Sequence, residues 1–319
     1  MTIRFAQIEP TTRCNFTCGF CTGRTMSQGD LSLESFRRIL ELHPDLEHLE
    51  LQGEGEPLLN ANFISMLELA RERDLRVSVI TNGSLLSPDI VEALLRLEVS
   101  SIHCSLESAE PNLFREIRGG KFEKLETGLT LLARERNERG LAFPQIGLAV
   151  TVLKKTMSAM AGIVEFYQAL GLDAGIFIQP LQKMPSYTSI YDEEMKRQLL
   201  SHEDLMAYHE TIYDIEGWQA VVKNKKNVSS FYRNLGKSVR GGETGCPWLL
   251  HGTFISYTGN VMPCCTVKSS DFSLGNVGDT PLEALDGART AMNQQLVGGA
   301  IPTACEGCGL ARKIAGRAS

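Results

Sequence analysis

The sequence has no excess of positive charge. It contains 32 lysine and arginine residues against 38 aspartate and glutamate residues, which gives a formal net charge of −6 and a pI near 5.6. A domain that binds nucleic acid usually carries a basic patch or stripe. The composition therefore argues against nucleic acid as a partner.

Long hydrophobic segments are also missing. No apolar run approaches the roughly 20 residues that a helix needs to span a bilayer. The N-terminus lacks the layout of a signal peptide, because Arg4 and Glu9 bracket a short strand-like run. We expect no membrane association and no secretion, and we find no internal repeat.

Without a secretion signal, the nine cysteines do not indicate a disulfide framework. They are typical of metal ligands in a protein of the reducing cytoplasm. The 319 residues, of which 43% are hydrophobic and 22% charged, suffice for one large globular domain and a small one.

Residues 1–185 alternate between strand-like and helical patterns. A succession of six such units implies a parallel sheet with right-handed crossovers. Six units are too few for a closed eight-stranded barrel, so we predict an α/β fold, an open partial (β/α)6 barrel of the TIM type. The expected strands are Ile3–Ile8, His48–Gln52, Arg76–Ile80, Ser101–Ser105, Gln145–Val152 and Ala174–Gln179, and the expected helices are Phe63–Arg73, Asp89–Leu97, Phe122–Arg136 and Ser158–Leu170.

The remaining residues fall into two parts. Residues 186–240 contain helical stretches around Asp192–Leu200 and His202–Tyr213, and they predict a helical bridge that also closes the substrate site. Residues 241–319 are rich in glycine and cysteine, and a hairpin is expected around Thr258 and Gly259.

Three cysteines near the N-terminus are the most informative feature. Cys14, Cys18 and Cys21 form a C-x-x-x-C-x-x-C motif directly after the first expected strand. Three thiolates can hold three irons of a [4Fe–4S] cluster and leave the fourth iron open to a ligand. A structural zinc site is the alternative, although zinc usually takes four ligands.

This motif resembles that of the radical S-adenosylmethionine (SAM) enzymes, and the resemblance extends over nearly the whole chain. It implies an open-site [4Fe–4S] cluster that binds SAM. An electron from a donor such as flavodoxin or ferredoxin cleaves SAM, and the resulting 5′-deoxyadenosyl radical abstracts hydrogen from the substrate. The partial barrel is also the core fold of this family.

Further motifs lie at the carboxyl ends of the expected strands, where parallel barrels gather their chemistry. The run Gly53-Glu54-Gly55-Glu56-Pro57 resembles the family's G-G-E-P motif, with Glu54 in place of a glycine. By this resemblance Glu56 receives the methionine ammonium group, and Arg118 pairs with the cofactor's carboxylate. The other cofactor contacts implied by the resemblance are Phe20, Gly55, Pro57, Asn82, Ser105 and Glu107. Each of these segments alone would also fit a polar turn or a solvated loop.

A second cysteine set lies in the last 75 positions. It resembles the twitch domain, a short form of the SPASM domain, in which four cysteines hold one auxiliary [4Fe–4S] cluster. A structural zinc site is again the alternative. The ligands that the resemblance implies are Cys246, Cys264, Cys305 and Cys308.

Cys265 is left over from this set. Adjacent residues on a strand point to opposite faces, so Cys264 and Cys265 are not expected to share one cluster. Cys264 fits the ligand pattern. Cys265 is then either a hydrogen-atom donor to a substrate radical, as in radical epimerases, or a buried bystander.

The layout resembles twitch-type enzymes that oxidise or epimerise a carbinol carbon of aminocyclitols or aminoglycosides. An acidic protein suits such a cationic substrate. A peptide-modifying enzyme is the alternative, although no leader-recognition domain is expected before the first strand. An iron–sulfur carrier without catalysis is a more remote one.

Overall fold

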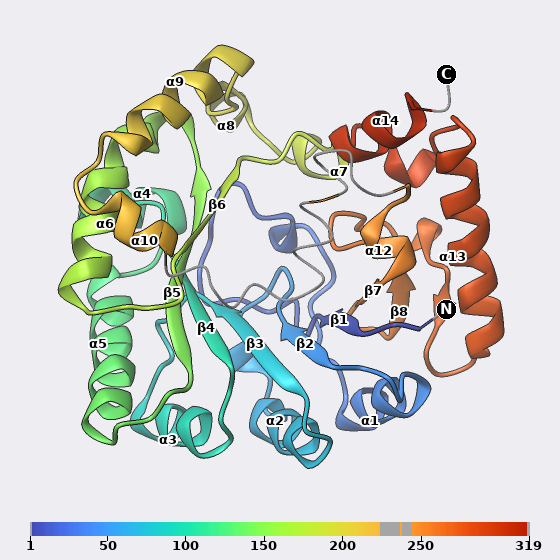
Figure 1. The fold of residues 1–319 in the computed structure, drawn as a ribbon, viewed down its shortest axis with the longest axis horizontal. Coiled ribbons are helices and arrows are strands. Elements are labelled where there is room, and N and C mark those ends of the chain that lie inside the picture. Colours follow the sequence, from blue (N-terminus) through green and yellow to red (C-terminus); the bar gives the residue numbers. More distant parts are fainter. Residues whose placement is uncertain (1, 224–236, 238–243, 318–319) are drawn as a thin grey trace.

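The computed structural model describes residues 2–223, 237 and 244–317. Parallel strands alternate with helices through the first half of the chain (Figure 1). The strands are β1 Phe5–Ile8, β2 His48–Leu51, β3 Arg76–Thr81, β4 Ser101–Ser105, β5 Gln145–Val152 and β6 Ile176–Pro180. The helices between them are α1 Leu33–Leu42, α2 Phe63–Glu72, α3 Pro88–Arg96, α4 Pro111–Arg118, α5 Phe122–Glu138 and α6 Met160–Ala169.

These strands form the sheet that was predicted. The order is β6-β5-β4-β3-β2-β1, every neighbouring pair is parallel, and the sheet stays open at β6. Two of the helices, α1 and α4, were not anticipated. Helix α1 begins at a conventional N-cap, in which the Ser32 side chain accepts a hydrogen bond from the Ser35 backbone N–H.

The second half of the chain extends the same sheet. Strand β7 (Gly252–Ile255) pairs in parallel with β1, and β8 (Asn260–Met262) and β9 (Gly275–Asn276) follow in antiparallel order. The expected hairpin joins β7 to β8, and Gly259 adopts the positive φ of 82° that its turn requires. The cysteine-rich region is thus continuous with the barrel sheet.

The second half of the chain also contributes helices. Helices α7 (Pro185–Thr188), α8 (Glu193–Arg197), α9 (His202–Tyr213) and α10 (Trp218–Lys223) form the described part of the predicted bridge. The rest of that bridge, residues 224–236 and 238–240, lies outside the described residues, as do 241–243 and 318–319 of the predicted C-terminal domain. The last helices are α12 (Pro247–Leu250), α13 (Leu282–Val297) and α14 (Gly309–Ala315).

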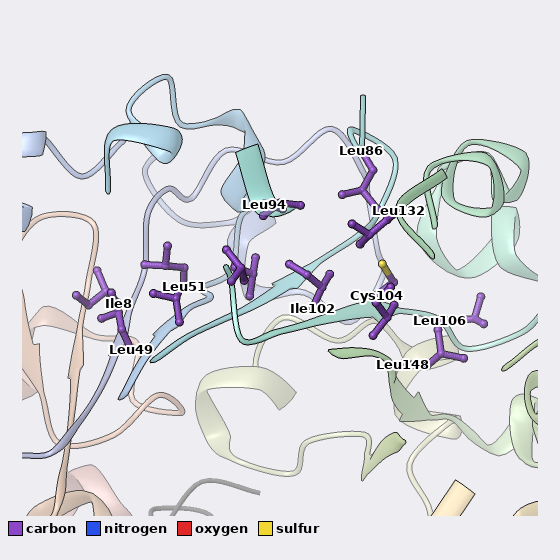
Figure 2. Packing of buried hydrophobic residues seen from close by; sticks show 14 of the residues in the cluster. Ile8, Leu49, Leu51, Leu86, Leu94, Ile102, Cys104, Leu106, Leu132 and Leu148 are labelled. Atoms are coloured by element: carbon purple, nitrogen blue, oxygen red, sulfur yellow. The ribbon is translucent and has the colours of Figure 1, made fainter. Parts of the chain in front are cut away.

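The two faces of the barrel sheet differ in chemistry. Residues such as Ile8, Leu51, Ile102 and Leu148 lie on the outer face and pack against the surrounding helices (Figure 2). Cys104 belongs to this core and is fully buried, as expected for a small hydrophobe. Because side chains alternate along a strand, the other face must carry the residues between them.

Those inward residues are largely polar. Gln7 and Glu50 face each other in the register of β1 and β2, and Ser78 follows on β3. His48 also hydrogen-bonds Ser78. The interior of this barrel is therefore lined by groups that can bind polar ligands. No helix in the described ranges is long and apolar enough to cross a membrane.

A buried arginine fastens the C-terminal helix α13 to the sheet. Arg289 is 1% exposed, and its guanidinium donates to the Gly252 carbonyl oxygen at 2.8 Å and to the Thr253 hydroxyl. Both acceptors belong to β7. This contact holds the C-terminal part of the chain on the strand that pairs with β1.

We expect Arg289→Met to lower the free energy of unfolding by about 2–5 kcal/mol, because it leaves buried acceptors without their charged donor. Urea unfolding of the apoprotein measures this. The control is Arg96→Met, which removes an exposed ion pair with Glu68 and should cost at most about 1 kcal/mol. Equal losses in the two variants would contradict the anchoring role.

Candidate functional site

The first cysteine motif lies on a loop between β1 and α1, and two other segments hold this loop. On one side, the Glu56 backbone N–H donates to the Arg13 carbonyl oxygen at 2.8 Å. Gly55 lies so close that a Cβ atom there would be 2.4 Å from the Thr11 carbonyl oxygen and 2.5 Å from that of Arg13. Only glycine permits this approach, which explains its place in the motif.

The C-terminal end of α4 holds the other side. The Thr17 N–H donates to the Arg118 carbonyl oxygen at 2.9 Å, and the Gly19 N–H donates to that of Ile117 at 3.4 Å. These carbonyls belong to the last turn of the helix, where no intrahelical donor reaches them. Gly119 ends α4 with a φ of 68°. The loop is thus fixed by the ends of elements far apart in the sequence.

The three thiols of this loop lie in one neighbourhood. Cys14 is exposed, Cys18 buried and Cys21 partly buried. Burial raises the pKa of all three thiols, that of Cys18 to about 11. The charge of Cys14 adds to the rise in the pKa of Cys18, and the charge of Cys18 adds to that of Cys21. Asn82 Nδ2 lies 3.9 Å from Cys14 Sγ, and Arg118 Nη1 lies 3.8 Å from Cys18 Sγ. Donors thus already point at two of the sulfurs.

Glu56 lies beneath the loop, buried to 1% exposure. Its carboxylate accepts hydrogen bonds from the Thr81 hydroxyl and the Asn82 N–H, both at 2.6 Å, and from the Leu58 N–H at 3.2 Å. Burial raises the pKa of Glu56, and these hydrogen bonds oppose the shift. Pro57 follows and begins the 3-10 turn Pro57–Leu59. The structure thus joins the motif after β2 to the end of β3.

Arg118 and Glu107 form a buried ion pair at the next strand ends. Arg118 Nη2 donates to Glu107 Oε1 at 2.6 Å, and Nε contacts the second oxygen. The bidentate edge expected to meet the cofactor's carboxylate is therefore occupied by Glu107, and Nη1 faces Cys18. The Arg118 guanidinium carbon lies 5.9 Å from the centre of the partly buried Phe20 ring. Ser105 ends β4 beside this group and is half-buried.

Four thiols of the second set also lie together. Burial is the largest cause that raises the pKa of Cys246, Cys264 and Cys305. The negative charge of a neighbouring thiolate raises each pKa further. The neighbours are Cys264 and Cys305 for Cys246, Cys308 for Cys264, and Cys264 and Cys308 for Cys305. Cys246 precedes α12 and Cys308 caps α14. Short turns bring these residues together from three segments.

The donor set of these residues is made of thiols. Cysteine thiolates are the ligands of [4Fe–4S] clusters, and four thiolates also suit zinc. Within residues 2–223, 237 and 244–317, no three His, Cys, Asp or Glu side chains are placed to hold a single metal ion.

Cys265 adjoins the auxiliary set and also lies near charged groups of the barrel. Burial raises its pKa most, and the charged groups that act on it besides the adjacent Cys264 are Lys268, Glu50 and Glu54. Glu50 and Glu54 belong to β2 and the loop after it, whereas Lys268 follows Cys265 by three positions on the loop after β8. Cys264 and Cys265 lie in the turn that follows β8 and not on a strand, so the strand alternation expected of this pair does not apply. Both side chains are half-buried and pack against the same apolar cluster, which contains Phe254.

The sequence analysis missed a polar group beside Cys21. Lys268 Nζ lies 2.6 Å from Glu54 Oε1, and the Tyr187 hydroxyl donates to the same oxygen at 3.0 Å. Glu9 accepts a hydrogen bond from the Glu54 N–H at 2.9 Å. The one available signal was Glu54 itself, the position at which the motif departs from glycine. Its partners come from segments that no local pattern connects.

Comparison with known proteins gives two family matches. The model of the radical SAM superfamily matches residues 8–152, and the SPASM model, an iron–sulfur cluster-binding domain, matches residues 246–309. All seven cysteines of the two sets fall within these ranges.

Two curated relatives are similar over part of their length. The tungsten-containing aldehyde ferredoxin oxidoreductase cofactor-modifying protein of Pyrococcus furiosus is 25% identical over 66% of this chain and 62% of its own. The AdoMet-dependent heme synthase of Methanosarcina barkeri is 29% identical over 51% of this chain and 46% of its own. The matches thus span less than two thirds of these relatives.

Solved structures of Streptococcus suis SuiB share the fold. The structure bound to SAM has a TM-score of 0.71 at 18% identity, and covers 98% of this chain and 72% of SuiB. The structure bound to the precursor peptide SuiA has a TM-score of 0.70 at 17% identity, and the match covers 98% of this chain and 71% of that SuiB chain. The predicted fold, a partial barrel followed by an iron–sulfur domain, is confirmed.

The close approach of Gly55 leads to a prediction. Gly55→Ala should destabilise the apoprotein by about 1–3 kcal/mol, because the new methyl group meets backbone oxygens that cannot move aside. Gly162→Ala is the matched control, since Gly162 lies within α6 with nothing near its added Cβ. That variant should gain up to about 1 kcal/mol. Urea unfolding measures both, and a neutral Gly55→Ala would refute the steric argument.

Proposed function

Since the chain belongs to the radical SAM superfamily and carries a SPASM-type iron–sulfur domain, we propose that it abstracts hydrogen from a carbinol carbon of a small polar substrate. An aminocyclitol, an aminoglycoside or a related aminosugar is the substrate class. The observation that carries the proposal is the polar inner face of the barrel sheet, where Gln7, Glu50 and Ser78 lie on neighbouring strands.

The two cysteine sets hold the two cofactors of such an enzyme. Cys14, Cys18 and Cys21 hold the [4Fe–4S] cluster to which SAM binds. The auxiliary [4Fe–4S] cluster is held by Cys246, Cys264, Cys305 and Cys308. When bound, the first cluster and SAM supply a 5′-deoxyadenosyl radical, with an electron from a flavodoxin- or ferredoxin-type donor.

The residues around the first set bind and orient SAM. Glu56 accepts a hydrogen bond from the Asn82 N–H beside the cysteine loop. Glu107 orients the Arg118 guanidinium so that its Nη1 atom points at Cys18 Sγ. A guanidinium with its other edge already paired has little rotational freedom left, so ligand binding would cost less conformational entropy. The full set is Phe20, Gly55, Glu56, Pro57, Asn82, Ser105, Glu107 and Arg118.

Cys265 determines the fate of the substrate radical in this proposal. Because burial raises its pKa, the side chain keeps its S–H hydrogen at neutral pH. Transfer of that hydrogen atom to the carbon radical forms a C–H bond on the opposite face and leaves a sulfur radical. One electron from the external donor and one proton from solvent then restore the thiol. The net result is epimerisation, with one SAM consumed.

Oxidation is the alternative outcome at the same carbon. Loss of one electron and of the hydroxyl proton from the carbon radical gives a ketone, and the auxiliary cluster held by Cys246, Cys264, Cys305 and Cys308 would supply the electron acceptor. The product mass separates the outcomes, since it is unchanged for the epimer and lower by two hydrogens for the ketone.

An inward carboxylate supports a cationic substrate. Glu50 lies on the inner face of β2 opposite Gln7 of β1, whereas the carboxylate of Glu54 is paired with Lys268. A peptide substrate is the second candidate, and the SuiB complex with a precursor peptide favours it. Anaerobic turnover with candidate aminosugars and peptides, following 5′-deoxyadenosine and product mass, tests both. A protein that never forms 5′-deoxyadenosine under these conditions would not be the proposed enzyme.

The cluster assignment predicts about eight irons per chain after anaerobic reconstitution, from two four-iron clusters. Changing Cys14, Cys18 and Cys21 together to alanine should leave about half the iron and abolish 5′-deoxyadenosine formation. Iron analysis and chromatography measure these quantities. Stoichiometric zinc with only four irons in the wild type would remove the auxiliary-cluster assignment.

The donor role makes a separate prediction for Cys265→Ala. This variant should retain both clusters and still cleave SAM, but it should yield no epimer. In deuterated water, the wild type should place one deuterium at the inverted carbon, because the thiol hydrogen exchanges with solvent. Mass spectrometry and NMR detect the label.

Cys104→Ala is the matched control for that prediction, because it removes a buried thiol outside both cysteine sets. It should keep the epimer and its label. A ketone product without label, formed equally by the wild type and Cys265→Ala, would overturn the donor role and leave oxidation. Loss of the auxiliary cluster in Cys265→Ala would show that Cys265 is a ligand.

A further inference from the structure

The Glu54–Lys268 ion pair connects the two cysteine regions. Glu54 lies on the loop after β2 and Lys268 on the loop after β8, three positions beyond Cys265. The two side chains are only 11% and 10% exposed, and their charged atoms lie 2.6 Å apart. Removing two charges from water is costly, so the fold maintains this pair at a specific place.

Neighbouring groups hold the pair in position. The Tyr187 hydroxyl donates to Glu54 Oε1. Lys268 Nζ lies 5.8 Å from the centre of the Tyr187 ring and 5.2 Å from that of Phe254, within the range of cation–π attraction. The Glu54 backbone N–H is held by Glu9. Lys268 and Tyr187 thus hold Oε1 of the Glu54 carboxylate. Oε2 therefore points away from these two donors.

That other oxygen faces Cys21. Cys21 Sγ lies 3.4 Å from Glu54 Oε2 and 3.3 Å from the Glu54 carbonyl oxygen. In the apoprotein the thiol can donate a hydrogen bond to these oxygens. A thiol that ligates iron has lost this hydrogen, so a thiolate and a carboxylate then face each other at close range in a poorly solvated site.

We propose that Glu54 lowers the reduction potential of the cluster held by Cys21, and that Lys268 and Tyr187 are positioning residues that keep its carboxylate there. The inference rests on the proposed role of Cys21 as a ligand. Reduction adds negative charge to the cluster, and a carboxylate nearby opposes it, because cluster potentials depend on local charge and hydrogen bonding. A lower potential makes the reduced cluster a stronger electron donor.

The test is an EPR-monitored redox titration of the reconstituted holoprotein without SAM or substrate. Glu54→Gln keeps the shape and removes the charge, so the potential of the first cluster should shift upward. The triple alanine variant of Cys14, Cys18 and Cys21 identifies the auxiliary signal, which should move much less. Glu9→Gln is the matched control, because it neutralises a carboxylate of the same polar group that has no contact with Cys21 among the described residues.

A second variant keeps the test valid if Glu54→Gln fails to fold, because the single change leaves the buried Lys268 without its partner. Glu54→Gln with Lys268→Met removes both charges and should also shift the potential upward, by less than the single change. An unchanged potential in both variants overturns the proposal, as does an equal or larger shift in Glu9→Gln. Because no substrate is present, these results do not depend on the substrate class. A wrong ligand assignment would appear separately, as the full iron content of the wild type, and not about half of it, retained in the triple alanine variant.

Discussion

The site depends on the clamping of a loop that has little structure of its own. Backbone carbonyls at the end of α4 accept hydrogen bonds from Thr17 and Gly19, and the Gly55 backbone presses against Thr11 and Arg13 from the other side. Neither contact involves a cysteine. Three thiols must be held in a defined arrangement before any iron is bound, and rigid element ends can do this without using the side chains that the chemistry needs.

The second constraint on the site is that side chains alternate between the two faces of the barrel sheet. Its outer face is apolar and joins the helices into one core, while its inner face carries residues such as Gln7 and Glu50. Burying polar groups costs free energy unless they are hydrogen-bonded. The polar interior is therefore less stabilising than an apolar one of equal volume, and a polar substrate is a physical reason to keep it.

Much of this could be predicted from the sequence, because it depends on local patterns. The alternation of strands and helices follows from periods of two and 3.6 residues. The same period failed for Cys264 and Cys265, because these residues lie in the turn after β8 and not on a strand. Helix α4 escaped prediction, as it is short. The Glu54–Lys268 pair could not be found either, because pairing of charges between distant loops depends on how the loops approach one another.

Strand β7 explains how two cysteine regions far apart in the sequence come close together. Because β7 pairs in parallel with β1, the C-terminal region joins the barrel sheet directly beside the strand that precedes the first cysteine motif. Lys268, from the segment after the return strand β8, then reaches Glu54 on the loop after β2. A domain on a flexible tether would leave the distance between two clusters free to vary. A shared sheet fixes it, and the Glu54–Lys268 pair adds a charged contact where the two loops meet. The relative position of thiol, carboxylate and cluster ligand is thus a property of one continuous fold.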